Sequence, residues 1–280
     1  MKLLALVLLV TTMLGAGLQV DVKRFGVLLR NYGLLIRALL VNFVLVPGFA
    51  VLVVRTLHAG EFVSIGIVLM ALAPGVPFLV NSAGRKQGGS MTFALAISFC
   101  FTAISVVTIP LTAALVLPGG SSFAIDGPAF FMKLGLFQLL PLVAGALIAT
   151  RLAPATSEKL AKGLGLVFLV AAVALLVTIL PKLVQYVSSL VGFGHLWIIA
   201  LVALFSGASG WLFGGPDIAY RRTLSIATLM RNVGICASIG AGETFANTLV
   251  LPTIATYFVV SFVISIPARI LYARTKETPA

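Results

Sequence analysis

Residues 221–240 read RRTLSIATLMRNVGICASIG, an apolar stretch that carries a permanent positive charge, Arg231, at its middle. Asn232 and Gly234, which follow Arg231, are poor helix formers. In a membrane, backbone groups freed by such an interruption must pack against protein or line a cavity. The stretch therefore predicts a broken membrane helix, and such breaks often form the binding sites of secondary transporters.

The composition of the whole chain indicates a membrane location. Of its 280 residues, 60% are hydrophobic and 9% charged, and the mean hydropathy is +1.17. A water-soluble domain carries about 25% charged residues, so we expect an integral protein of the lipid bilayer. The net charge of +12 does not indicate nucleic-acid binding, because the 19 Lys and Arg residues are scattered in small groups between apolar runs.

The sequence contains no residue pattern typical of an enzyme or of a metal site. Cys100 and Cys236 lie within apolar runs, where cysteines are commonly buried small hydrophobes. His58 and His195 lie at the ends of predicted helices and belong to no cluster with metal-ligand spacing. We therefore expect no enzyme activity, no catalytic residue, and no resident metal or cofactor.

Nine apolar segments are long enough to cross the bilayer, which takes about 20 residues of helix. Their approximate ranges are 2–19, 31–56, 62–82, 90–116, 128–150, 163–184, 194–213, 223–242 and 247–272. The first also resembles a signal peptide, but no clear cleavage site follows its long apolar run, so we expect a retained span. The sequence thus predicts an all-α polytopic membrane protein with nine transmembrane helices.

The charged residues predict how these helices are oriented. Thirteen of the 19 basic residues lie in alternate loops and the C-terminal tail: Lys23, Arg24, Arg30, Arg85, Lys86, Arg151, Lys159, Lys162, Arg221, Arg222, Arg269, Arg274 and Lys276. Since Lys and Arg are enriched in cytoplasmic loops, we expect the C-terminus in the cytoplasm and the N-terminus outside. We expect the membrane to be the inner (plasma) membrane of a bacterium. The seven acidic residues all fall in loops or at helix ends.

A second interruption lies within the span 62–82, at Pro74, Gly75 and Pro77. Proline removes a backbone donor and clashes with the preceding turn, so this span is also expected to break. Each broken span is followed by a long one with a proline near its far end. The two breaks are five spans apart and therefore cross in opposite directions. This arrangement is typical of an inverted repeat, here of four and five spans.

Three stretches resemble the bile acid/sodium symporter (BASS) family. They are RRTLSI with MRNVG within 221–234, LAPGVP at 72–77, and LLALVLLVTTMLGAGLQVDVKRFGVLLRN at 3–31. The resemblance implies a nine-helix version without that family's first helix. It also implies a panel domain of the spans 2–19, 128–150 and 163–184, with the other six spans forming a core domain. The family moves organic anions, such as bile salts and keto acids, usually together with sodium.

The sequence departs from the family where the family binds sodium. The resemblance places Ala227 at a common glutamate and Arg231 at a common glutamine, both of which help to bind sodium in the family. Asn42 replaces another glutamine, and Met230 belongs to the same remnant of the cation site.

The resemblance also places Phe93 and Ile97 where the family has hydroxyls, in the helix after the first break. Elementary chemistry argues against a sodium site as well. Hard cations prefer oxygen ligands, often with a carboxylate, and no acidic residue lies within a predicted span. A guanidinium at about 4 Å, with an effective dielectric constant of about 20, repels a monovalent cation by about 4 kcal/mol. Sodium binding is therefore disfavoured.

Three interpretations of Arg231 remain open. In the first, its guanidinium replaces the sodium ion and bonds to carbonyls of the broken helices and to Asn42. In the second, it binds the carboxylate of a substrate, which its planar arrangement of donors suits. In the third, it extends to the cytoplasmic surface. The first two are compatible with each other. The further candidates for substrate contact are Asn81, Ser82, Thr228 and Asn232.

These observations favour a secondary carrier for an organic anion, either bile-acid-like or a small carboxylate, that works by alternating access. Coupling to sodium is expected to be absent because Arg231 occupies the cation site. Two alternatives remain. One is a conventional sodium-coupled organic anion symporter. The other is a non-transporting membrane sensor or binding protein that kept the fold, although no long loop is present to transmit a signal.

Overall fold

The computed structural model describes residues 1–20, 26, 31–75, 88–116, 127–192, 195–242, 245 and 248–274, and within them only the backbone of 114–116, 127–130 and 182–192. In these ranges every regular element is a helix. Six helices are long and apolar enough to cross a membrane: Tyr32–Thr56, Met91–Ala113, Phe131–Arg151, Pro154–Pro181, His195–Phe213 and Val250–Arg274. Lys2–Gly17 and Glu61–Leu72 are shorter apolar helices. The chain is therefore an all-α polytopic membrane protein, as its sequence predicts.

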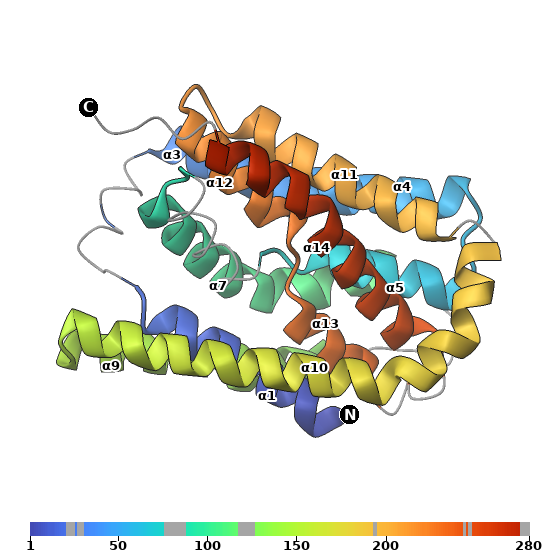
Figure 1. Cartoon of the computed structure of the whole chain (residues 1–280), viewed down its shortest axis with the longest axis horizontal. Coiled ribbons are helices and arrows are strands. Elements are labelled where there is room, and N and C mark those ends of the chain that lie inside the picture. The colour runs from blue at the N-terminus through green and yellow to red at the C-terminus, as the bar shows by residue number, and fades with distance from the viewer. Residues whose placement is uncertain are drawn as a thin grey trace.

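Three rods of helix form a layer along one side of the molecule (Figure 1), which we call the three-helix layer. They are α1 (Lys2–Gly17), the run of α8 (Gly127–Leu134), η2 (Gly135–Leu139) and α9 (Leu140–Arg151), and α10 (Pro154–Gly192). Glycines bring α1 and α9 into backbone contact. A Cβ atom on Gly17 would lie 2.2 Å from the carbonyl oxygen of Leu142, and one on Gly145 would lie 2.4 Å from that of Leu14. Small residues allow such close crossings of membrane helices.

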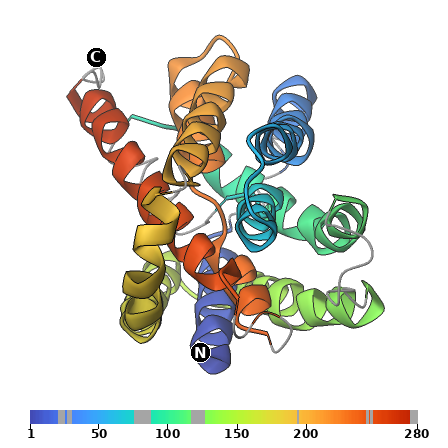
Figure 2. The same ribbon diagram turned by 90° about the vertical axis from the view of Figure 1, so that its right-hand side faces the viewer.

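The remaining helices lie on one side of this layer (Figure 1). They are α3 (Tyr32–Leu40), η1 (Val41–Leu45), α4 (Val46–Thr56), α5 (Glu61–Leu72), α7 (Met91–Val116), α11 (His195–Phe213), α12 (Ile218–Leu229), α13 (Val233–Gly240) and α14 (Val250–Arg274). The end-on view in Figure 2 shows α13 in the middle, between α1 and the other helices. A Cβ atom on Gly234 of α13 would lie 3.1 Å from the Cα atom of Leu9 in α1. Gly234 therefore lets α13 reach the three-helix layer.

One helix is much longer than its apolar segment predicts. The sequence indicates a span at 163–184, whereas α10 runs from Pro154 to Gly192. Proline is well tolerated in the first turn of a helix, because the N–H group it lacks has no partner there. Glu158 and Lys162 add an ion pair of 3.2 Å one turn apart. Hydropathy misses these first turns because they are polar.

Two wide turns interrupt the helices with π-helical geometry. The first, η1, precedes Pro47, and the second, η2, precedes Pro141. A proline leaves the carbonyl four residues before it without its α-helical partner, so each wide turn lies where an α-helical hydrogen bond is lost. Each π-helix carries one carboxamide, Asn42 in η1 and Gln138 in η2, and both side chains are fully buried. Bulges of this kind are frequent at functional sites.

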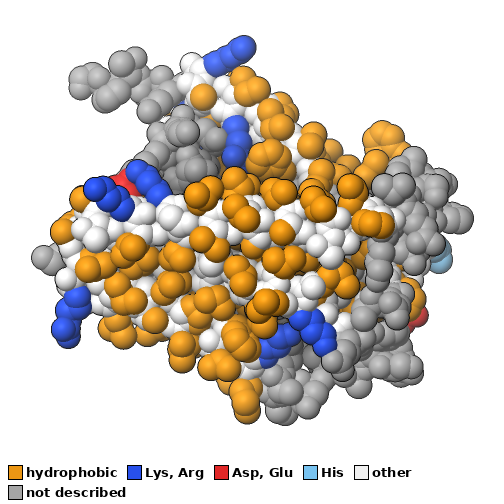
Figure 3. Space-filling model, turned by 60° about the horizontal axis from the view of Figure 1, so that its bottom comes forward, with side chains coloured by type: hydrophobic (Ala, Val, Ile, Leu, Met, Phe, Trp, Pro, Cys, Tyr) orange, Lys and Arg blue, Asp and Glu red, His pale blue; other side chains and the backbone are white. Residues whose placement is uncertain are grey.

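The outer surface of the three-helix layer is apolar. Figure 3 shows hydrophobic side chains covering much of this face. Exposed examples on α9 and α10 are Leu140, Leu147, Leu166, Val170 and Val177. A surface of this extent is typical of a protein that contacts lipid.

Candidate functional site

The two predicted helix breaks meet inside the protein. The first follows α5, where Ala73 is extended with φ −100° and ψ 91°. The second separates α12 from α13, where Met230 is also extended. The backbone N–H of Asn232 donates a hydrogen bond of 3.1 Å to the carbonyl of Ala73. Each break therefore satisfies a backbone group of the other, as a membrane interior requires.

Gly75 gives the first break its shape. Its φ of +53° lies in the left-handed region, which side chains other than hydrogen disfavour. A Cβ atom there would lie 3.6 Å from the ring of Phe101 and 3.7 Å from the carbonyl oxygen of Ala227. The break at Pro74 and Gly75 thus occurs where the sequence predicts it. Pro77 lies outside the described residues.

The second break lies at Arg231 and Asn232 as predicted, but it ends earlier than expected. Gly234 was expected to interrupt the helix, but it lies within α13, which already begins at Val233. The side-chain oxygen of Asn232 accepts a hydrogen bond of 3.3 Å from the N–H of Ile235 and so caps this helix. Gly234 as a helix break is therefore wrong, because the cap starts the helix before it. The actual break is Met230–Asn232.

Arg231 is fully buried at this break. Its Nη1 donates a hydrogen bond of 3.2 Å to Oδ1 of Asn42. The Nδ2 group of Asn42 donates to Oγ1 of Thr228 at 3.1 Å and to the carbonyl of Ala38 at 3.0 Å. The wide turn η1 thus places one carboxamide between a guanidinium and a hydroxyl. The chain Arg231–Asn42–Thr228 joins η1, α12 and the second break.

Two expectations about Arg231 are contradicted. It does not extend to the surface, since none of it is exposed. It also forms no hydrogen bonds to carbonyls of the broken helices, because its Nε and Nη2 atoms have no partner in the described part of the chain. Nearby carbonyls are already used. That of Ala73 accepts from Asn232, and that of Arg231 itself accepts from the N–H of Val233 at 3.0 Å.

Tyr257 and Cys236 are further polar neighbours of the guanidinium. The hydroxyl of Tyr257, on α14, interacts with Arg231, with Ser206 of α11 and with Cys236 of α13. The hydroxyl lies close enough to Arg231 and Ser206 for a hydrogen-bonding interaction. Within the described residues, however, it makes no hydrogen bond of regular geometry, and it is fully buried. The thiol of Cys236 donates instead to the carbonyl of Leu69 in α5, at 3.3 Å.

The other predicted site residues are placed as follows. Ala227 and Met230 are buried, on α12 and at its C-terminal cap. The remnant of a cation site at these positions stays a prediction. Thr228 and Asn232 are also buried, and both use their side chains for hydrogen bonds within the protein. Asn81 and Ser82 lie outside the described residues.

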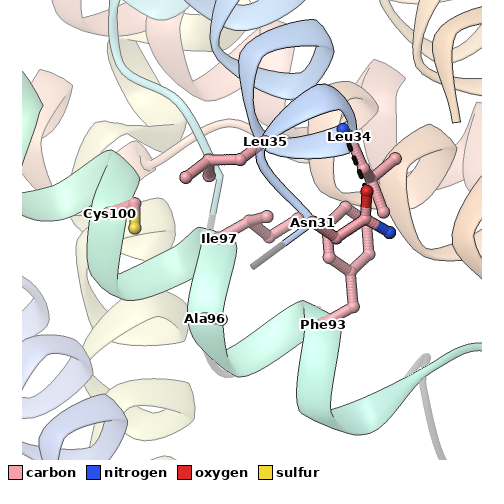
Figure 4. A pocket seen from close by; sticks show the side chains of 7 residues that line it. All are labelled: Asn31, Leu34, Leu35, Phe93, Ala96, Ile97 and Cys100. Carbon is pink, nitrogen blue, oxygen red and sulfur yellow. Dashed lines mark hydrogen bonds between the residues drawn. The ribbon is translucent and has the colours of Figure 1, made fainter. Parts of the chain in front are cut away.

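The two positions expected to carry hydroxyls in the family contribute to an apolar pocket. Phe93 and Ile97, on α7, line a small pocket together with Asn31, Leu34, Leu35, Ala96 and Cys100. Figure 4 shows these side chains between α3 and α7, with Asn31 accepting from the N–H of Leu34 at 3.4 Å. Side chains of this kind offer an ion almost no ligands.

Sequence analysis missed one polar residue of the interior, Gln138. Its Nε2 donates to the carbonyl of Thr102 at 2.8 Å and to Oγ of Ser105 at 2.5 Å. These bonds join η2 in the three-helix layer to α7. A signal was present, because Gln138 is an isolated amide in an apolar span, three residues before a proline. Polar residues within membrane spans are costly and often functional.

A second polar contact joins the same two parts of the molecule. Lys133 of α8 donates from Nζ to the carbonyl of Ser238, at 2.9 Å. This carbonyl lies near the C-terminal end of α13, where a positive charge is favoured by the helix dipole. Lys133 and Gln138 therefore both tie the three-helix layer to the helices beside it.

Comparison with known proteins agrees with this architecture. The family model described as the Sodium Bile acid symporter family matches residues 6–205, which run from α1 into α11. No curated protein is similar enough to the sequence to count as a match. The family match spans most of the chain and includes the first break and Asn42. The chain belongs to the Sodium Bile acid symporter family.

Proposed function

We propose that this protein is a secondary transporter of an organic anion, either bile-acid-like or a small carboxylate, and that it works without sodium. Its family is one of transporters and not of enzymes, which supports transport as the general activity. The absence of sodium coupling rests on the chain's own residues around the two breaks.

The observation that carries the proposal is the buried hydrogen bond between Arg231 and Asn42. A guanidinium in this position supplies the positive charge that a coupling ion would otherwise bring. A sodium ion at about 4 Å would be repelled by about 4 kcal/mol at an effective dielectric constant of about 20, a factor of nearly a thousand in affinity. In the described part of the chain, no carboxylate lies close enough to offset this repulsion, since Glu61, Glu158 and Asp217 lie at or near the starts of helices.

We infer that transport occurs by alternating access, with the three-helix layer as the panel and the other helices as the core. The crossing of the two breaks through Asn232 and Ala73 supports an inverted repeat of nine spans. We place the substrate beside this crossing, near Thr228, Arg231 and Asn232. These three residues are fully buried, so substrate contact requires a conformation in which the panel and core separate. We place the N-terminus outside and the C-terminus in the cytoplasm, in a bacterial inner membrane.

Counterflow in proteoliposomes tests the proposal. Vesicles are loaded with unlabelled taurocholate or pyruvate, and uptake of the same labelled compound is followed in sodium chloride and in choline chloride. We expect uptake above that of protein-free vesicles, at equal rates in the two salts. The variant Arg55→Gln, at an exposed position of α4, should give the same uptake as the wild type, because its charge lies outside the proposed site.

Two other outcomes correspond to the alternatives. Uptake that requires sodium would contradict the proposal and indicate a conventional sodium symporter. Binding of an organic anion without any counterflow would indicate a non-transporting sensor or binding protein. The hydrogen bond between Arg231 and Asn42 favours sodium-independent transport over the first alternative.

A further inference from the structure

Arg231 carries a positive charge that no acidic side chain in the described structure neutralises. The side chain is fully buried, and it makes one hydrogen bond, to the neutral amide of Asn42. The acidic residues of the described part of the chain are Glu61, Glu158 and Asp217, at or near the starts of α5, α10 and α12. None is close to the break. Buried charges in proteins are normally paired or bound to a counter-ion.

Several other polar atoms in the interior also lack partners. The Nε and Nη2 atoms of Arg231 and the hydroxyls of Thr253, Tyr257 and Ser261 have no hydrogen bond in the described part of the chain. All of these side chains are at least nine-tenths buried. Thr253, Tyr257 and Ser261 are four residues apart along α14 and therefore lie on one face of it. Tyr257 is the member of this row that interacts with Arg231.

The chemistry of the unpartnered atoms decides which species fits between them. Arginine nitrogens are donors only, and a tyrosine hydroxyl can also donate. A water molecule would satisfy some of these hydrogen bonds but would leave the charge unbalanced. A cation is excluded because it would face donors and a second positive charge. A small anion accepts from all the donors and neutralises the guanidinium at the same time.

We propose that Arg231 and Tyr257 bind a chloride ion, accepted by Nε and Nη2 of the guanidinium and by the Tyr257 hydroxyl. This chloride is a resident counter-ion of the broken helix and is distinct from the transported organic anion. The inference rests on the buried charge alone. It bears on the sodium argument, because a bound chloride offsets the charge of Arg231. With chloride bound, that argument rests on the lack of a nearby carboxylate ligand in the described part of the chain.

Thermal stability of the purified protein tests this site. The melting temperature is measured as potassium chloride replaces potassium methanesulfonate at constant ionic strength, with no sodium and no organic substrate. A ligand that binds the folded protein raises the melting temperature as its concentration exceeds its dissociation constant. We expect a saturable rise with chloride. A melting temperature that is the same in both salts would overturn the proposal.

Three variants locate the ion. Arg231→Gln removes the charge and should abolish the response to chloride, whereas the matched variant Arg55→Gln should retain it. Tyr257→Phe keeps the charge and removes one donor, and should raise the chloride concentration at half-maximal effect at least three-fold. An unchanged response in Tyr257→Phe or in Arg231→Gln would contradict the site. If Arg231→Gln does not fold, Tyr257→Phe still provides the test.

A direct measurement uses bromide in place of chloride. Crystals grown in bromide should give an anomalous scattering peak between the guanidinium of Arg231 and the hydroxyl of Tyr257. A peak found elsewhere, or a water molecule at this position in bromide, would overturn the proposal. Because this experiment involves no transport, its failure would leave the proposed sodium-independent carrier to be judged by counterflow.

Discussion

Arg231 and Asn42 lie 189 residues apart in the chain and share a hydrogen bond in the interior. Sequence analysis anticipated this pair from the resemblance alone, which places both residues at a predicted cation site. It could not anticipate that two nitrogens of Arg231 remain without partners. The positions of these nitrogens depend on how the two breaks cross in the folded protein, as the bond between Asn232 and Ala73 shows.

The first prediction concerns sodium. The double variant Ala227→Glu with Arg231→Gln introduces the carboxylate and the amide that the resemblance predicts at these two positions. We expect the melting temperature of this variant to rise with sodium, relative to choline at fixed ionic strength, because a hard cation then has oxygen ligands and no competing charge. The wild type should not respond. A double variant that folds but shows no sodium response would argue against Arg231 lying in the cation site.

The second prediction concerns the pairing itself. Asn42→Leu removes the acceptor of a buried charge, and should lower the free energy of unfolding by about 2–3 kcal/mol. Adding Arg231→Met to this variant removes the unpaired charge and should restore part of the loss. Denaturant or thermal unfolding of both single variants and the double variant measures the coupling. If the two losses simply add, the hydrogen bond does not contribute to stability.

At the scale of helices, apolar runs and prolines were sufficient to predict most of the architecture. The break at Pro74 and Gly75 occurs where expected, and the ends of most described helices lie within a few residues of the predicted spans. The second break was located at Arg231 and Asn232 as observed, but its end was placed too late, at Gly234. Asn232 can either interrupt a helix or cap one, and its role depends on which backbone N–H group it accepts from. The wide turns were missed because the sequence shows the proline but not where the lost hydrogen bond is compensated.

The third prediction compares two glycines in different backbone conformations. Gly75→Ala places a Cβ atom on a left-handed residue, and should destabilise the protein by about 1–2 kcal/mol. Gly48→Ala, at a position of α4 with nothing within 4 Å of the added atom, should stabilise it by about 0.5–1 kcal/mol. Unfolding measurements on both variants provide the comparison. Equal effects would mean that the first break does not need its left-handed residue.

At the scale of the whole molecule, the three-helix layer is joined to the other helices by Lys133 and Gln138. Under the proposed alternating access, the layer moves relative to α7 and α13, so these hydrogen bonds are expected to break and reform in each cycle. Sequence analysis assigned the panel spans but gave no reason to choose Gln138 as the contact, because its partners Thr102 and Ser105 belong to another helix.

The fourth prediction follows from this motion. In a Cys100→Ala, Cys236→Ala background, Gln138→Cys and Ser105→Cys are joined by a short bifunctional thiol reagent that reduction cleaves. We expect uptake to stop on cross-linking and to return on reduction. The control pair is Gly15→Cys with Leu164→Cys, where the two Cβ atoms would lie 3.7 Å apart within the layer. This distance suits a disulfide, which should leave uptake unchanged. Loss of uptake in the control, or its survival in the first pair, would contradict a moving layer.

A guanidinium attached to the chain differs from a bound ion in one respect, which is that it cannot be released on the far side of the membrane. Under the proposed function, each cycle therefore moves the charge of the substrate with no compensating cation. For a monovalent anion, an inside-negative membrane potential opposes uptake by about 2.3 kcal/mol for each 100 mV, or about fifty-fold in concentration. With Arg231 buried and fixed in the chain, the proposed carrier is therefore driven toward export by the membrane voltage. Exchange of one anion for another moves no net charge, so voltage does not oppose uptake by that route.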